Sequence, residues 1–297
     1  MAQALPAGIQ LALDQALAQW RQWDARAGLD APPALVQQLG SGLSNYSFLV
    51  GNKPGFVVRI DGISPNTFGL SRQTEWRILQ SAHEAGIAPR PCYFNPQLGA
   101  LVCEFVAPDG ERESPEDIAQ LLRSIHALPG CHKRLDLGER LARYVRTIKS
   151  ARNKPAALTT TVLELAAKVQ QQMLEASHPT TELRLCHNDL LRANRISSGS
   201  ALLAIDWEYA AMGNPWYDLA AVVAGDELST HATEKLLEAY LHRPPGNQEW
   251  EELHHFCCVY RCIELLWYLC RDATAQGPAL QRKLQRLQAQ SANHENW

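Results

Sequence analysis

The sequence predicts an α+β protein with two lobes: a small antiparallel β-sheet lobe with helices, then a larger, mostly helical lobe. Residues 35–60 alternate apolar runs with turns that contain Gly, Asn or Pro, a pattern typical of a strand meander. Beyond a polar connector at 107–114, almost every segment has the apolar spacing of a helix. With 297 residues, 46% of them hydrophobic, the chain is long enough for both lobes. We expect residues 1–106 to form the first lobe and residues 107–297 the second.

The first lobe begins with a predicted amphipathic helix over residues 6–27, where Ile9, Leu13 and Leu17 recur at helical spacing. Three strands are expected next, at 35–39, 46–50 and 56–60. Helical spacing returns at 71–85, which Gly86 terminates. A last strand is expected at 100–106.

The second lobe opens with a strong helix start at Ser114, which is followed by a proline and, at the third position, by Asp117. Six further helices are expected at 140–152, 160–176, 218–224, 230–240, 248–271 and 278–290. The exception is a short hairpin over 195–205, whose two apolar runs flank a Ser-Ser-Gly-Ser turn.

Two motifs carry the chemistry: CHNDLLRANRI at 186–196 and AIDWEYA at 204–210. Asp189 and Asn194 are five residues apart, and Asp206 follows twelve residues later. The predicted hairpin returns Asp206 to the side of Asn194. Phosphoryl transfer requires one carboxylate that orients an acceptor hydroxyl, and two oxygen ligands for Mg²⁺. We therefore expect Asp189 to act as the base and Asn194 and Asp206 to hold metal.

The same residues carry a family resemblance. HNDLLRAN and IDWEYAAMGNPWYDLA, with GLSNYSFLV at 42–50 and FVVRI at 56–60, resemble the choline/ethanolamine kinase and thiamine kinase branch of the aminoglycoside phosphotransferase family. The resemblance implies a protein-kinase-like fold, ATP and Mg²⁺ as cofactors, and a small-molecule alcohol as acceptor. Asn188 and the pair Trp207-Glu208 depart from the HRD and DFG motifs of protein kinases, in agreement with this branch.

On the nucleotide side, the GSGLSN turn at 40–45 supplies candidate phosphate contacts at Gly42, Ser44 and Asn45. Arg59 stands where protein kinases have the strand lysine, and a guanidinium can clamp phosphate oxygens. Glu75, on the following helix, is expected to hold Arg59; the alternative is a surface pair with Arg72 or Arg77.

The backbone at the end of the 100–106 strand is expected to contact adenine, through Glu104 and Val106.

On the acceptor side, aromatic residues are frequent in the second lobe and can enclose an organic cation. The candidate substrate contacts besides Asp189 are Trp207, Glu208, Trp216, Trp267 and Tyr268. For each ring taken singly, core packing is favoured over a cage, since aromatic residues dominate core packing. Asp218 resembles the family aspartate that braces the catalytic loop, and His126 is expected to be a buried core residue.

Composition limits the partners. The net charge is -3 and the basic residues are scattered, which argues against nucleic-acid binding. The sequence shows neither a signal peptide nor an apolar stretch of about 18 residues, so we expect a cytoplasmic protein without a membrane partner. The eight cysteines are then reduced thiols. His254, Cys258 and Cys262 share a helical face; core packing is favoured there over metal binding. The oligomeric state stays open.

The leading interpretation is an ATP-dependent kinase of a cationic alcohol such as choline, ethanolamine or thiamine. One alternative is an aminoglycoside or sugar kinase, because acidic residues accumulate between 226 and 252. The other is a catalytically silent pseudokinase, although the predicted base and metal ligands are all present.

Overall fold

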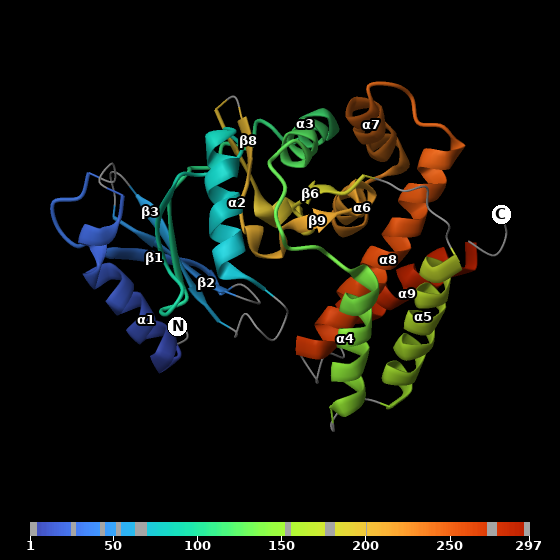
Figure 1. The fold of residues 1–297 in the computed structure, drawn as a ribbon. Helices are drawn as coiled ribbons and strands as arrows, with labels where there is room; N and C mark the ends of the chain where they lie inside the picture. The colour runs from blue at the N-terminus through green and yellow to red at the C-terminus, as the bar shows by residue number, and fades with distance from the viewer. Residues whose placement is uncertain are drawn as a thin grey trace. The chain divides into compact units, whose positions relative to one another are not determined.

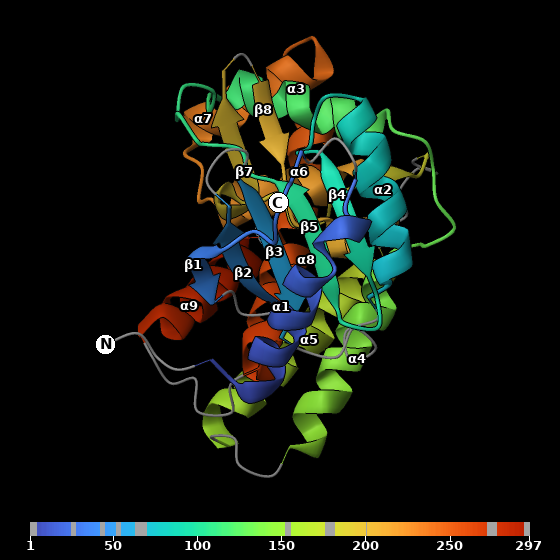
Figure 2. The same cartoon turned by 90° about the vertical axis from the view of Figure 1, so that its left-hand side faces the viewer.

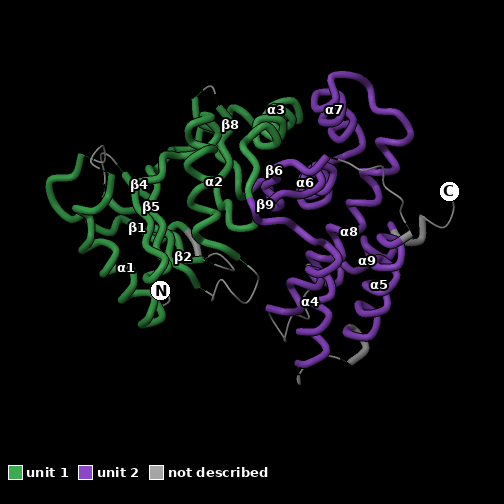
Figure 3. Tube along the Cα trace, in the orientation of Figure 1, with its two compact units in different colours: residues 1–131, 193–210 green, residues 132–192, 211–297 purple. Residues whose placement is uncertain are grey.

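The computed structural model describes residues 5–24, 28–41, 45–51, 55–62, 70–151, 156–175, 182–199, 201–271 and 278–293. The chain forms two compact units (Figure 3). The first comprises residues 1–131 and 193–210, and the second comprises residues 132–192 and 211–297. The first unit thus extends past Val106 and includes the predicted hairpin. The lobe boundary at Val106 stays a prediction.

A five-stranded antiparallel sheet forms the first unit, with strand order β1-β2-β3-β5-β4. Its strands are β1 Leu35–Ser41, β2 Asn45–Val50, β3 Phe56–Asp61, β4 Pro91–Asn95 and β5 Ala100–Glu104. The predicted strands are confirmed, with β5 ending two residues early. Sequence reasoning missed β4, because a proline at its start reads as a break. As an edge strand beginning at Pro91, β4 tolerates that residue.

Two helices cover opposite faces of this sheet (Figures 1 and 2): α1 Ala7–Ala18 and α2 Arg72–Glu84. Phe56, Val58 and Ile60 alternate along β3 and share one apolar core with Leu13 of α1. Their neighbour Arg59 therefore points to the other face, where α2 lies.

The N-terminal helix is shorter than the expected 6–27. It ends at Ala18, and a 3₁₀ turn, Trp20–Gln22, follows. The chain leaves the helix so that Trp23 can be buried against Phe56 and Tyr93, with ring centroids 5.5 and 6.3 Å away. Burial of a large ring outweighs a few more helical residues.

The rest of the first unit matches the sequence patterns closely. Helix α3 spans Pro115–His126 and begins with the predicted capping box of Ser114 and Asp117. The 3₁₀ turn Arg192–Asn194 leads into the hairpin of β7 Arg195–Ser198 and β8 Ala201–Ala204. A further 3₁₀ turn, Trp207–Tyr209, follows.

The second unit is helical, as predicted. Its helices are α4 Leu137–Ser150, α5 Ala156–Glu175, α6 Pro215–Gly225, α7 Thr230–Leu241, α8 Asn247–Arg271 and α9 Pro278–Asn293. Helix α8 packs against α4, α5, α6 and α9 (Figure 1). A two-stranded sheet of β6 Arg184–Cys186 and β9 Ala211–Gly213 was not expected, since three-residue strands give almost no periodic signal. Within the described residues, none of the helices meets the length and hydropathy needed to span a bilayer.

Candidate active site

The predicted pair of Arg59 and Glu75 is confirmed. Arg59 Nη1 and Nη2 donate to Glu75 Oε1 and Oε2 at 2.5 and 2.8 Å, in a parallel fork. Burial alone would raise the pKa of Glu75, but the charges of Arg59 and then Arg72 hold it below its usual range. The pKa of Arg59 lies well above its usual value, since the surrounding carboxylates outweigh burial. Strand β3 and helix α2 therefore share a permanent ion pair.

Arg59 also reaches the predicted metal ligand. Its Nη1 lies 2.9 Å from Oδ1 of Asp206, whose side chain is 31% exposed. Burial, then the charge of Glu208, raises the pKa of Asp206 to about 7, and Arg59 opposes this shift. The backbone of Asp206 is left-handed, at φ 61° and ψ 61°.

The hairpin places Asn194 beside Asp206, as predicted. Arg195 pairs with Ala204 across the two strands, and Ile205 N–H donates to the carbonyl of Asn194 at 3.0 Å. The two candidate metal ligands thus sit at the two ends of one hairpin.

A second arginine, Arg72, occupies the same buried cluster. Its guanidinium contacts Asp61, Glu75 and Glu208. Two arginines thus face four carboxylates when Arg59 and Asp206 are included. The carboxylates outnumber the guanidinium groups, and carboxylate oxygens are ligands that magnesium prefers. Asp206 is the carboxylate best placed to hold it, because Glu75 and Glu208 are almost fully buried.

The structure changes the roles expected for Glu208 and Asn45. Glu208 is 3% exposed and accepts from Arg72 and from Asn45 Nδ2, each at 3.0 Å. Its charge is already compensated, which favours a structural role over the expected substrate contact. The Asn45 side chain likewise points into the cluster, accepting from Arg72. Gly42 and Ser44 lie outside the described residues.

At the end of β5, where adenine contacts are expected, some backbone groups already have hydrogen-bond partners within the protein. The N–H groups of Glu104 and Phe105 donate to the carbonyls of Arg90 and Gly55, each at 2.9 Å. The Glu104 carboxylate faces Arg90 Nε at 3.4 Å. The backbone carbonyl of Glu104 and the backbone of Val106 keep their expected role as a prediction.

In the second unit, the loop after β6 carries Asp189. His187 N–H and Asn188 N–H donate to the two oxygens of Asp218, at 2.8 and 2.7 Å. Asp218 is fully buried on α6. Asn188 has a positive φ of 64°, a conformation that such bonds help to hold. The predicted bracing role of Asp218 is confirmed.

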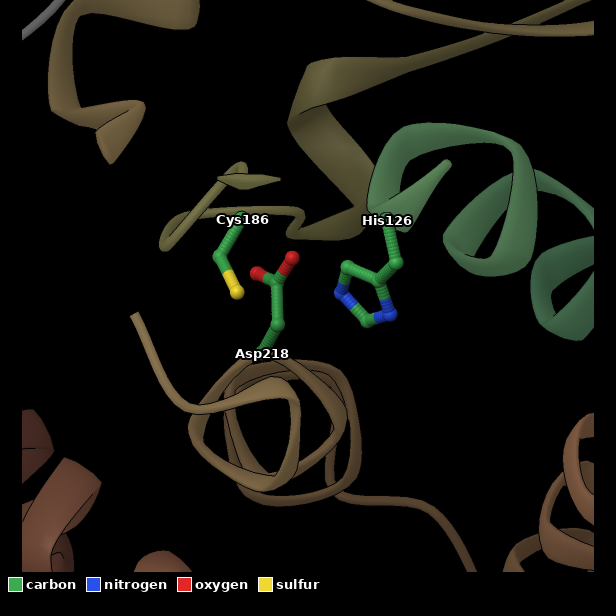
Figure 4. A group of neighbouring side chains, drawn as sticks. All are labelled: His126, Cys186 and Asp218. Atoms are coloured by element: carbon green, nitrogen blue, oxygen red, sulfur yellow. The ribbon is translucent and has the colours of Figure 1, made fainter. Parts of the chain in front are cut away.

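Figure 4 shows Asp218 beside Cys186 at the end of β6. Burial, then the charge of Asp218, raises the pKa of the Cys186 thiol well above its usual value. His126, also labelled there, is a buried residue of α3 in the first unit, as expected. Within the described residues, His254, Cys258 and Cys262 do not form a metal-binding group. All eight cysteines are free, and burial raises the pKa of Cys257 to about 12.

Three tyrosines gather near Asp189: Tyr144 of α4, Tyr217 of α6 and Tyr260 of α8. Burial is the main cause of the raised pKa of each phenol, and the charge of Asp189 adds to it. Arg140 opposes the shift at Tyr144 and Tyr217. Sequence reasoning missed Tyr144 and Tyr260, because nothing local links α4 and α8 to the catalytic motif.

Three of the four rings expected to contact the substrate have protein contacts of their own. Trp207 is 1% exposed, and its indole N–H donates to the Ala204 carbonyl, so it is a core residue. Arg271 lies over the Trp267 ring and Lys283 over the Tyr268 ring, each 5.2 Å from the centroid. Those two rings already have protein cations on their faces. Trp216, half-buried in the first turn of α6, remains a candidate.

A strand cation held by a helical glutamate, next to a hairpin with two candidate metal ligands, is the arrangement of a kinase-like phosphotransferase. The chain belongs to the phosphotransferase enzyme family, whose model matches residues 35–256.

Individual proteins similar to this chain support the family assignment. The chain is 27% identical to thiamine kinase of Salmonella typhimurium over 216 residues, covering 71% of this chain and 74% of the relative. It is 34% identical to protein LicA of Haemophilus influenzae over 90 residues, which cover 29% of this chain and only 34% of LicA's length. The crystal structure of a choline/ethanolamine kinase family protein from Mesorhizobium loti superposes with a TM-score of 0.71 at 23% identity, covering 94% of each chain. The protein-kinase-like fold expected from the motifs is thereby confirmed.

Proposed function

We propose that this protein transfers the γ-phosphate of ATP to the hydroxyl of a small alcohol. The observation that carries this is the buried chain of contacts from Glu75 through Arg59 to Asp206, with Asn194 next to it on the same hairpin. Such an arrangement fixes a cation and a metal ligand at the place where a triphosphate is held in kinases.

Each residue has a distinct task in this proposal. Arg59 contacts phosphate oxygens, and Asp206 and Asn194 hold Mg²⁺, which when bound neutralises charge on the phosphates. Asp189 accepts the proton of the acceptor hydroxyl while the oxygen of that hydroxyl forms a bond to the γ-phosphorus. The bond from that phosphorus to the β–γ bridging oxygen breaks, and ADP leaves. Asp218 keeps the loop of Asp189 in place through two backbone bonds.

We propose a small cationic alcohol, of the choline, ethanolamine or thiamine kind, as the acceptor. The carboxylate of Asp189 and the half-buried ring of Trp216, the remaining aromatic candidate, favour an acceptor with a single positive charge. The names of the thiamine kinase and choline/ethanolamine kinase relatives support the same class.

A polycationic aminoglycoside is less favoured. Several acids between 226 and 252 already have partners: Glu227 pairs with Arg286, Glu249 pairs with Arg243, and Asp226 accepts from the Arg192 N–H. With eight free thiols, a reducing compartment such as the cytoplasm is the location we propose.

The test is an ATP-consumption screen with Mg²⁺ over choline, ethanolamine, thiamine, simple sugars and aminoglycosides. We expect ADP and a phosphorylated product with one of the three cationic alcohols. Turnover of only a sugar or an aminoglycoside would refute the acceptor class. ATP binding without turnover of any alcohol would instead indicate a pseudokinase.

A further inference from the structure

Arg72 makes more contacts than a surface helix residue needs. It is the first residue of α2 and is 7% exposed. All three of its guanidinium nitrogens are used. Nε and Nη2 contact the two oxygens of Asp61 at 3.0 and 2.7 Å, and Nη1 lies 2.9 Å from Glu75 and 3.0 Å from Glu208. Nη2 also donates to Asn45 Oδ1 at 3.1 Å.

These contacts join three segments that are distant in sequence. Asn45 begins β2, and Asp61 ends β3. Glu208 lies two residues after Asp206, in the 3₁₀ turn Trp207–Tyr209 that packs on α2. Asn45 Nδ2 also donates a hydrogen bond to Glu208 at 3.0 Å, so these two partners of Arg72 hold each other in place.

Arg72 contacts Glu208 in the 3₁₀ turn Trp207–Tyr209, which directly follows Asp206 in the chain. A non-glycine residue in the left-handed region is held there by its surroundings at a cost of about 1–3 kcal/mol. The segment before Asp206 is fixed by the bond from Ile205 N–H to Asn194, and the segment after it by Glu208 on Arg72. Loss of the contact between Arg72 and Glu208 removes one of the contacts that fix the turn after Asp206.

We propose that Arg72 is a positioning residue, which through Glu208 and Asn45 sets the Asp206 carboxylate for a magnesium–nucleotide complex. This inference rests on the proposed function. It assigns a second arginine to the reaction, distinct from Arg59: Arg72 acts through protein carboxylates, whereas Arg59 contacts phosphate.

The test measures nucleotide binding, which needs no acceptor. Arg72→Met, Arg72→Lys and Glu208→Gln are compared with Arg77→Met, an exposed arginine of the same helix. Titration calorimetry gives the ATP affinity with and without Mg²⁺, and the Mg²⁺ concentration at half-saturation. We expect Arg72→Met to raise that concentration about tenfold or more, as loss of an outer partner does at metal sites. ATP affinity in EDTA should change less than about threefold.

The other variants keep the test decisive if Arg72→Met does not fold. Arg72→Lys retains the charge but not the five-contact geometry, so we expect partial rescue. Glu208→Gln keeps the side-chain shape and should raise the Mg²⁺ requirement in the same direction by about threefold or more. Arg77→Met should match the unsubstituted protein.

A folded Arg72 or Glu208 variant with an unchanged Mg²⁺ requirement overturns the inference. So does equal weakening with and without Mg²⁺, which indicates a merely structural role. If the unsubstituted protein binds magnesium–ATP but phosphorylates no alcohol, the proposed function fails while these binding data still decide the role of Arg72. If it binds no nucleotide, both fail.

Discussion

At the scale of single residues, the site depends on charges that stabilise one another. Among these charged groups, the ionised Asp206 carboxylate is the one that destabilises the fold. Burial and Glu208 raise its pKa from 3.8 to about 7 despite the charge of Arg59. Between those two pH values the folded protein binds a proton that the unfolded chain has lost. Ionised Asp206 therefore destabilises the fold as pH rises from 3.8 to about 7, and the full penalty remains above pH 7.

This predicts opposite effects of Asp206→Asn on stability and activity. At pH 8 without Mg²⁺, the variant should melt about 2–4 °C higher than the unsubstituted protein, a shift equivalent to about 1 kcal/mol in a chain of this size. The gain should be smaller at pH 5.5. Phosphoryl transfer should be lost. Thermal melts at both pH values and a turnover assay check this, with exposed Glu234→Gln as the control. A lower Tm at pH 8 contradicts the account.

At the scale of elements, the hairpin of β7 and β8 is fixed at its tip by the connector after β5. Asp109 accepts from Ser197 Oγ at 2.5 Å and from Gly199 N–H at 2.6 Å, and Ser197 Oγ also accepts from Arg112 N–H at 2.7 Å. The hydrogen bond from Ser197 is the main cause of a lowered pKa at Asp109. The segment that follows the predicted adenine strand thus holds the hairpin that carries Asn194 and Asp206.

Ser197→Ala removes both side-chain bonds from a residue that is 1% exposed. We expect a loss of about 1 kcal/mol in the free energy of unfolding. The KM for ATP should rise several-fold, about the effect of a small shift in a positioned group, with the KM for the acceptor unchanged. Ser198→Ala, next to it on the same strand, is the matched control. An unaltered KM for ATP in a folded Ser197→Ala protein would show that the hairpin is positioned by other contacts.

The helices and strands show which features can be predicted from the sequence and which cannot. Local patterns found the capping box at Ser114, the hairpin at 195–205 and the strand position of Arg59, because each depends on neighbouring residues. They missed β4 and the true end of α1, which depend on a proline at a sheet edge and on the burial of Trp23. The buried contacts of Glu208 were missed, since its partners Arg72 and Asn45 lie 136 and 163 residues away.

At the scale of the whole molecule, the two sets of functional residues belong to different units. Arg59, Glu75 and Asp206 lie in the first, and Asp189 with Asp218 lies in the second. The family match over residues 35–256 takes in all five. Variants of the two sets should therefore fail differently: those of the first unit in nucleotide or metal binding, and those of the second in transfer to the acceptor.

The most direct test of the central claim is transfer of ³²P from γ-labelled ATP to the best acceptor by Asp189→Asn, with ATP affinity measured on the same preparation. If Asp189 is the base, kcat should fall by about 10²–10⁴-fold, the usual contribution of a positioned base. The affinity for magnesium–ATP should stay within about twofold, because the nucleotide contacts lie in the first unit. Undiminished transfer by the folded variant would contradict the account.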